Sequence, residues 1–305
     1  MIVTVTLNPA IDYHIYVATL SRDKTNVMEK KEICCGGKGI NVSRTLALLK
    51  EKSVATGFLF SNDAALFEKQ LNDKYISSDF VIVEGSTRTN IKINQQNGSL
   101  IEINENNIVK EADFDKLIRK IDQYLIKDNI IILSGSLPQG LNEDSYLRLC
   151  LKAKERGCRI ILDSSKKPLK LAYKNCDVIK PNKEEFLYLT ELDSDSSLKS
   201  IARKIKDLNN DIVAVSLGNL GAIYKYKDEM YLARALNLEI KSTVGAGDAM
   251  VAALSYGLKN KKEFLDIVKD ASAISALMIT DFPEDNFAAE LEELKSRIKI
   301  ERLPI

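Results

Sequence analysis

The sequence predicts an α/β fold in which a mainly parallel sheet carries helices on both faces. Apolar stretches of strand length alternate with amphipathic stretches of helix length through most of the chain. Residues 130–133 are apolar at every position, as in strands that are covered on both faces. Polar and glycine-rich motifs follow several of these strands. Because ligands of such sheets bind beyond the carboxyl ends of the strands, we expect the functional site there.

The composition favours a globular enzyme. The chain has 305 residues, 45% of them hydrophobic, and 44 basic residues balance 43 acidic ones. This balance argues against binding to nucleic acid or to an anionic membrane through bulk charge. No leader and no apolar run of membrane-spanning length is found, and the five cysteines form no metal or disulfide pattern, so we expect a cytoplasmic protein. With a single histidine, acid–base chemistry falls to carboxylates or lysines.

In the first third of the chain, apolar residues predict a strand over residues 2–7, and Asn8-Pro9 ends this strand. Apolar and polar residues alternate over residues 13–35, as in two strands on either side of a polar turn at residues 21–24. A helix begins within residues 36–39, and residues 54–60 form a buried strand. A second pair of strands spans residues 89–104, where Asn97-Gly98 indicates a two-residue hairpin turn. These two strand-only segments could pair as one lid.

The remaining two thirds predict regular alternation. Helices are expected over residues 114–125, from about residue 142 to Gly157, after Pro181 and over residues 198–208. Strands are expected over residues 130–133, 159–163, 178–180 and 212–217, with two more between residues 222 and 233. The chain beyond residue 250 is largely helical. No linker or repeat divides it, so we expect a single unit.

Residues 242–250 predict an anion-binding turn, in which a strand-like segment breaks at two glycines and continues as a helix. The backbone N–H groups of Gly245, Ala246 and Gly247 would gather at the positive end of that helix, where phosphate binds and where charge that develops in group transfer is stabilised. Asp248 lies in the first turn. It could serve the chemistry, or it could simply complement the helix dipole.

Residues 36–41, Gly-Gly-Lys-Gly-Ile-Asn, resemble neither common nucleotide motif in full. They lack the four-residue gap and the Lys-Ser/Thr ending of a P-loop. Val42 and Met250 stand where a dinucleotide fingerprint needs its third glycine, which disfavours an NAD-dependent oxidoreductase. The hexapeptide could instead bring backbone amides, Lys38 and Asn41 to a sugar. Alternatively, its glycines allow close packing of a helix on the sheet.

Asn182 and Glu185 lie three residues apart in the first turn of a predicted helix, hence on one face. Two side-chain oxygens at that spacing could organise hydrated Mg²⁺, which keeps most of its waters. A helix cap would have the same sequence pattern.

Seven motifs, in this order, resemble the ribokinase-like sugar kinases of the PfkB family, and more narrowly bacterial 1-phosphofructokinases and tagatose-6-phosphate kinases. They occupy residues 8–12, 36–41, 87–90, 134–138, 180–185, 215–218 and 243–248. The resemblance implies a three-layer sandwich with a mainly parallel central sheet and a small β lid. The α/β core would comprise residues 1–10, 36–86 and 105–305, and the lid residues 11–35 and 87–104.

The resemblance also implies a role for each matching residue. Asp248 would be the base that accepts the proton of the attacking hydroxyl, and a helix terminus would keep it ionised, while the amides of residues 245–247 stabilise the transferring group. The sugar would be bound by Asp12, Gly37, Lys38 and Asn41. Its phosphate would be bound by Arg88, Asn90 and Lys24, although Lys24 could equally be a solvated turn lysine. The nucleotide would be bound by Lys180, Asn182, Ser216, Gly218 and Gly247.

The implied reaction transfers the γ-phosphoryl group of ATP to a sugar phosphate. Mg²⁺ would be held by Asn182 and Glu185 through water, and a monovalent cation such as K⁺ would assist. Fructose 1-phosphate is the expected acceptor and fructose 1,6-bisphosphate the product. Tagatose 6-phosphate and fructose 6-phosphate are alternatives, as is a sugar-phosphate sensor without turnover. Relatives pair through the lid, which makes a homodimer plausible. Lys166 stands where the family usually has glycine, and no ligand is assigned to residues 276–283.

Overall fold

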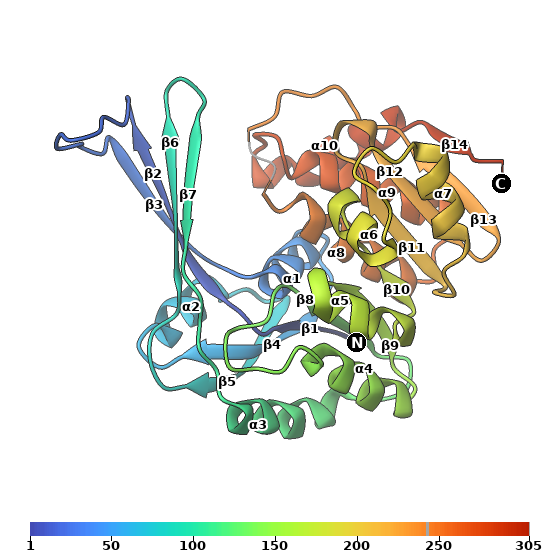
Figure 1. The fold of residues 1–305 in the computed structure, drawn as a ribbon, viewed down its shortest axis with the longest axis horizontal. Coiled ribbons are helices and arrows are strands. Elements are labelled where there is room, and N and C mark those ends of the chain that lie inside the picture. Colours follow the sequence, from blue (N-terminus) through green and yellow to red (C-terminus); the bar gives the residue numbers. More distant parts are fainter. Residues whose placement is uncertain (242–243, 305) are drawn as a thin grey trace.

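The chain forms two β-sheets, the larger of which lies between two layers of helices (Figure 1). The computed structural model describes residues 1–241 and 244–304. Within these ranges the larger sheet has ten strands. In spatial order they are β14 (Ile300–Arg302), β13 (Glu229–Ala233), β12 (Ala222–Tyr226), β11 (Ile212–Ser216), β10 (Val178–Ile179), β9 (Arg159–Asp163), β8 (Ile130–Ser134), β1 (Ile2–Thr6), β4 (Ser53–Phe60) and β5 (Ile76–Val83).

Neighbouring strands are parallel from β11 to β5, and antiparallel from β11 to β14. The predicted mainly parallel sheet is therefore confirmed. The parallel strands are apolar throughout because successive side chains point to opposite faces and both faces are covered. Ile131 and Leu133 of β8 enter one hydrophobic cluster, and Ile130 and Ile132 enter the other.

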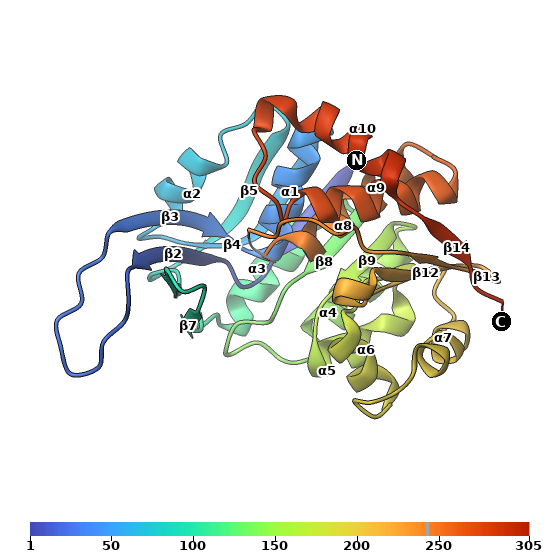
Figure 2. The ribbon, with the colours of Figure 1, turned by 90° about the horizontal axis from the view of Figure 1, so that it is seen from above.

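Helices cover both faces, as Figure 2 shows most clearly for α9 and α10 against α4 to α7. On one face lie α1 (Lys38–Leu48), α8 (Ala246–Lys259), α9 (Phe264–Leu277) and α10 (Phe287–Arg297). On the other lie α3 (Glu111–Ile121), α4 (Ser145–Glu155), α5 (Lys166–Ala172), α6 (Lys183–Thr190) and α7 (Leu198–Lys206). The predicted three-layer α/β sandwich is thus confirmed.

The smaller sheet projects from this body (Figure 1). Its order is β3 (Lys30–Gly36), β2 (Ala10–Val17), β6 (Thr89–Gln95) and β7 (Leu100–Asn104), with β2 and β6 parallel. The two strand-only segments therefore pair with each other. Helix α2 (Ala64–Gln70) supports the base of this sheet, where Phe67 packs with Ile11 and Cys35.

Local details differ from the sequence predictions. The β6–β7 hairpin is present, but its loop is longer than two residues: Gln95 N–H donates to the Ser99 carbonyl, and Gly98 has φ 82°. Residues 234–241 belong to no strand, and residues 242 and 243, where the motif begins, lie outside the described residues. Helices α2 and α5 and strands β5 and β14 were not predicted. In the described residues no helix is long and apolar enough to span a membrane.

Candidate active site

A cavity of about 1090 Å³ lies between the carboxyl edge of the central sheet and the smaller sheet. A smaller pocket of about 210 Å³ adjoins it and shares Lys38, Arg88 and Glu185. The predicted residues that line the large cavity are Asp12, Gly37, Lys38, Asn41, Arg88, Asn90, Lys180, Asn182, Glu185, Ser216, Gly218, Gly245, Ala246, Gly247 and Asp248. Segments that are far apart in the sequence therefore meet at one site.

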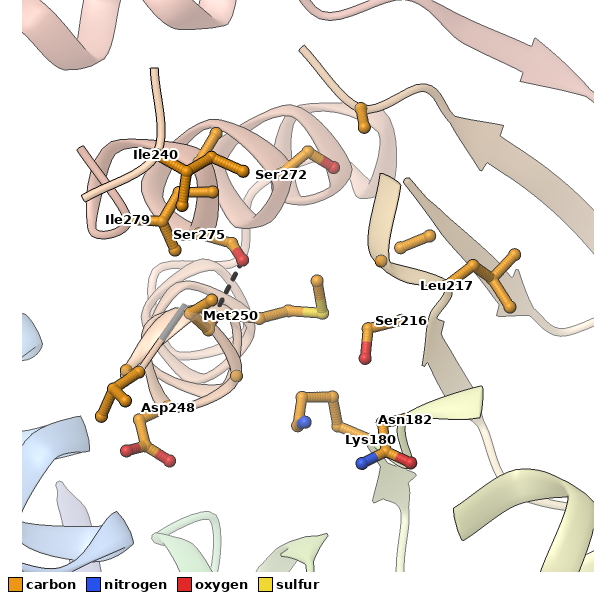
Figure 3. Close-up of a pocket in the computed structure, with 18 of the residues that line it drawn as sticks. Lys180, Asn182, Ser216, Leu217, Ile240, Asp248, Met250, Ser272, Ser275 and Ile279 are labelled. Atoms are coloured by element: carbon orange, nitrogen blue, oxygen red, sulfur yellow. Dashed lines mark hydrogen bonds between the residues drawn. The ribbon is translucent and has the colours of Figure 1, made fainter. Parts of the chain in front are cut away.

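The start of α8 forms one wall of the cavity. Gly245 precedes the helix with φ 91°, a left-handed backbone that glycine adopts without strain. Ser275 of α9 donates to the Ala246 carbonyl at 2.9 Å and so ties the turn to the neighbouring helix (Figure 3). The predicted turn at residues 245–247 is present, whereas Ser242 and Thr243 of the same motif lie outside the described residues. The positive end of α8 thus faces the cavity.

Asp248 lies in the first turn of α8 and is only 6% exposed. Its carboxylate accepts a hydrogen bond of 2.8 Å from the Asn41 side chain. Burial, together with the negative charge of Asp163, raises the pKa of Asp248 to about 6. The position of Asp248 at a helix terminus predicts that ionisation is favoured; the net effect is the opposite, because desolvation outweighs the favourable charges. A carboxyl with this pKa is still largely ionised at neutral pH and can accept a proton.

Asp163 connects two lysines beneath the cavity, and no sequence motif assigned it a role. It ends β9, is fully buried, and lies 3.2 Å from Lys38 Nζ and 3.3 Å from Lys180 Nζ. Burial alone would raise its pKa, but Lys180 and Lys38 outweigh burial and lower it. Lys180 in turn approaches the α8 turn: a Cβ added at Gly247 would lie 3.0 Å from its Nζ. The Lys180 ammonium is therefore held at the start of α8.

Asp12 and Asn90 belong to the smaller sheet and are bonded to each other. Asn90 Nδ2 donates to Asp12 Oδ1 at 2.8 Å, which leaves Asn90 Oδ1 buried without a hydrogen-bond partner in the described structure. Gly37 lies beside them at the start of α1 with φ 140°, and a Cβ there would come within 2.5 Å of Thr6 Cγ2. The backbone of this turn can therefore pass close to β1 only without a side chain.

Arg88 faces both pockets and is fixed by the backbone. Its Nε donates to the Pro9 carbonyl at 3.1 Å, and its two terminal nitrogens donate to Glu105 and Asn8 carbonyls at 3.3 Å each. The side chain of Asn107 accepts a hydrogen bond of 2.6 Å from the backbone N–H of Arg88. Because a guanidinium has five N–H groups, donors remain for an anion.

Asn182 and Glu185 form a capping box at α6. Glu185 N–H donates to Asn182 Oδ1, and Asn182 N–H donates to Glu185 Oε2, each at 2.8 Å. The cap that the sequence analysis considered is thus present. It leaves Glu185 Oε1 available, and burial raises the pKa of this carboxyl. Ser216, at the end of β11, lies next to Asn182 through a bond from its N–H to the Pro181 carbonyl.

The opposite end of the cavity is apolar. Ile240, Met250 and Ile279 line it, together with Ser272, whereas Asp248 and Lys180 lie at the charged end (Figure 3). Such an end suits a flat heterocycle.

Lys24 is the one predicted residue that does not line either pocket. It lies in the exposed loop of residues 18–29 between β2 and β3, where Asn26 bonds to its carbonyl. This loop projects from the smaller sheet (Figure 1), so the chain by itself does not bring Lys24 to the site. Conversely, Lys92, which the sequence analysis did not select, lines the cavity two residues beyond Asn90.

Comparisons with known proteins identify the family of the chain. Residues 5–286 match the model of the pfkB family carbohydrate kinases. A candidate phosphofructokinase from Staphylococcus aureus is 30% identical, with 99% of each chain covered and a TM-score of 0.83. A candidate 1-phosphofructokinase from Thermotoga maritima is 28% identical, with both chains fully covered and a TM-score of 0.82.

Phosphofructokinase-2 from Escherichia coli shares the fold, with a TM-score of 0.87 at 24% identity over 96% of this chain and 98% of that one. The family model matches residues 5–286, which is nearly the whole chain, and this match assigns the family. The chain belongs to the pfkB family of carbohydrate kinases.

Proposed function

We propose that the protein transfers the γ-phosphoryl group of ATP to a sugar phosphate, with fructose 1-phosphate as the acceptor. The observation that carries the proposal is the position of Asp248. Its carboxylate lies in the same cavity as the α8 terminus and as Arg88, which can bind an anion. A base, a site for the transferring group and a site for a second phosphate are the parts that this reaction needs.

In the proposed reaction the sugar hydroxyl oxygen bonds to the γ-phosphorus while the bond from that phosphorus to the β–γ bridging oxygen breaks. The hydroxyl proton passes to Asp248, and ADP leaves. The amides of Gly245, Ala246 and Gly247 and the Lys180 ammonium stabilise the charge of the transferring group. Asn41 orients Asp248 through its 2.8 Å hydrogen bond. The nucleotide base occupies the apolar end of the cavity, and Ser216 and Gly218 line the same cavity.

Arg88 supports a phosphorylated acceptor. Its guanidinium is held in one orientation by three carbonyls and has no carboxylate partner in the described structure, so its charge is available to a ligand. The adjoining pocket also contains the hydroxyls of Ser136 and Ser165, which can donate to phosphate oxygens. A neutral sugar would leave the Arg88 charge without an anionic partner.

Fructose 1-phosphate is preferred over two related acceptors. The similarity to the Thermotoga candidate 1-phosphofructokinase supports it. Fructose 6-phosphate is the second candidate, because E. coli phosphofructokinase-2 has been solved in complex with that sugar. Tagatose 6-phosphate remains the third, through the motifs shared with tagatose-6-phosphate kinases.

Glu185 fits a water-mediated role in binding Mg²⁺. The described residues contain no cluster of three or more metal-binding side chains, and the cap leaves one Glu185 oxygen facing the cavity. One or two protein ligands are enough for Mg²⁺ when phosphate oxygens and water supply the other ligands. Bound there with Asn182 nearby, it would neutralise phosphate charge. A monovalent cation also remains a prediction; E. coli phosphofructokinase-2 has been solved with potassium.

We further propose a homodimer through the smaller sheet. Asp12, Asn90 and Lys92 face the cavity, so the alternate residues face away. That outer face is apolar, with Ile33, Ile101 and Ile103 exposed by 39, 38 and 55%. A second copy would cover it. Ile103→Asp should then shift the mass measured by light scattering from dimer to monomer; a wild-type monomer would refute the proposal.

The direct test of function is a coupled ADP-release assay. Purified protein is given ATP, Mg²⁺ and, separately, fructose 1-phosphate, fructose 6-phosphate, tagatose 6-phosphate or fructose. We expect the highest kcat/KM with fructose 1-phosphate. A different preferred sugar phosphate would correct the substrate, and binding without ADP release would indicate a sensor.

A further inference from the structure

Lys92 is a nearly buried cation on the cavity side of the smaller sheet. It belongs to β6, is 8% exposed, and lines the large cavity. Because successive strand residues alternate between faces, Lys92 shares its face with Asn90, and with Asp12 on the paired strand β2. The three side chains form a cluster that the mechanism above does not fully use.

The hydrogen-bonding capacity of this cluster is incompletely filled. Lys92 Nζ lies 3.6 Å from Asp12 Oδ1, which is an ion pair but too long for a hydrogen bond. Its ammonium has no hydrogen bond within residues 1–241 and 244–304 as described. Asn90 Oδ1 is a buried acceptor that is likewise unpartnered in those residues. A buried acceptor that lacks a partner is costly unless a ligand supplies one. Lys92, which lines the same cavity, has N–H donors that are free, within the described residues, to bind that ligand.

A sugar hydroxyl matches this cluster better than a phosphate does. A hydroxyl donates one hydrogen bond and accepts others, so it can donate to Asn90 Oδ1 or Asp12 while accepting from Lys92. A phosphate dianion placed there would face the Asp12 carboxylate and the Asn90 carbonyl oxygen. Arg88 has no such carboxylate partner and is the better phosphate site.

We propose that Lys92 contacts the substrate and, with Asp12 and Asn90, recognises hydroxyl groups of the acceptor sugar. The proposal rests on the sugar-kinase function proposed above. It also changes the role of Asn90, which the sequence analysis assigned to the phosphate: its Nδ2 is engaged by Asp12 and its free atom is an acceptor. Specificity then comes from two places, Arg88 for the phosphate and the Lys92 cluster for the hydroxyls.

The test compares Lys92→Met with wild type in the ADP-release assay with fructose 1-phosphate. We expect KM for the sugar phosphate to rise about 10- to 100-fold, because a hydrogen bond to a charged group is lost. KM for ATP should change less than twofold. Inorganic phosphate, used as a competitor of the sugar, should keep its inhibition constant within twofold. Lys69→Met is the control, since Lys69 belongs to α2, is exposed and lines neither pocket.

An unchanged KM for the sugar phosphate in Lys92→Met would overturn the proposal. So would a parallel loss of inhibition by inorganic phosphate, which would make Lys92 a phosphate ligand. Circular dichroism and the melting temperature verify that the variant is folded. Lys92→Arg keeps the positive charge and the N–H donors, so it should raise KM for the sugar phosphate less than Lys92→Met does. If wild type releases no ADP with any sugar phosphate, the proposed function fails, and that result is separate from the effect of Lys92.

Discussion

The two walls of the active site differ in how completely their polar groups are paired. On the central sheet, Asp163 is fully buried between two lysines, and Asp248 is buried against Asn41. On the smaller sheet, Lys92 and Asn90 have unfilled hydrogen-bonding capacity. The first wall is supported by two large hydrophobic clusters and the second by one small cluster around Phe67.

This difference indicates a division of labour. Groups that must hold charge in a fixed geometry lie on the wall that packing already fixes, where electrostatic effects are strongest. The groups that we propose bind the sugar lie on the smaller sheet, which has only a small hydrophobic cluster beneath it. Substitutions on the central sheet should therefore change turnover and stability, and substitutions on the smaller sheet should change substrate affinity.

The largest expected effect is on turnover in Asp248→Asn. Loss of the base should lower kcat by about 10³-fold, within the range usual for general-base removal. Steady-state ADP release measures it. Asp270→Asn is the matched control, because Asp270 is an equally buried aspartate on α9 that pairs with Lys262 and Lys295 outside the cavity. Similar kcat losses in both variants would show that burial, and not base chemistry, explains the effect.

Asp163→Asn should cause the largest loss of stability. It leaves Lys38 and Lys180 without their carboxylate, and removing one member of a buried ion network costs about 3–5 kcal/mol of unfolding free energy. Urea unfolding followed by circular dichroism measures it. Glu293→Gln, which breaks an exposed pair with Arg297, should cost less than about 0.5 kcal/mol. Equal values for the two variants would contradict the assigned role of Asp163.

Asp248→Asn should also stabilise the fold at neutral pH. A folded-state pKa of about 6 against 3.8 means that the folded protein binds the proton more tightly, so this group's contribution to stability falls as pH rises from about 4 to 6. At pH 7 the ionised Asp248 carboxyl lowers the free energy of unfolding by about 3 kcal/mol, and an uncharged asparagine removes this cost. Urea unfolding at pH 7 and at pH 4 checks this: the gain should be present at pH 7 and vanish at pH 4. Destabilisation at pH 7 would be the contrary result.

A smaller effect is expected from Arg88→Ala on the other wall. Loss of the phosphate-binding guanidinium should raise KM for the sugar phosphate about 10- to 100-fold and leave KM for ATP within twofold. Initial-rate kinetics with each substrate varied in turn measure both constants. If both KM values rise equally, Arg88 supports the fold of the site and does not bind the sugar's phosphate.

Sequence patterns predicted the central sheet well because its strands are apolar on both faces and its helices are regularly periodic. They missed β14, whose three residues pair only through tertiary contact with β13. At the site, motif residues were predictable because glycine and proline mark turns. Asp163 could have been found, since it ends an apolar strand at the ligand-binding edge. Its coupling to Asp248 could not, because desolvation depends on the packed structure.

The division of labour is tested most directly by kcat and KM for fructose 1-phosphate in Asp248→Asn and Arg88→Ala, determined side by side. The account predicts that the first variant loses kcat with KM within about threefold of wild type, and that the second raises KM with kcat within about threefold. Near-normal kcat in Asp248→Asn, or a loss in Arg88→Ala that falls on kcat alone, would contradict it.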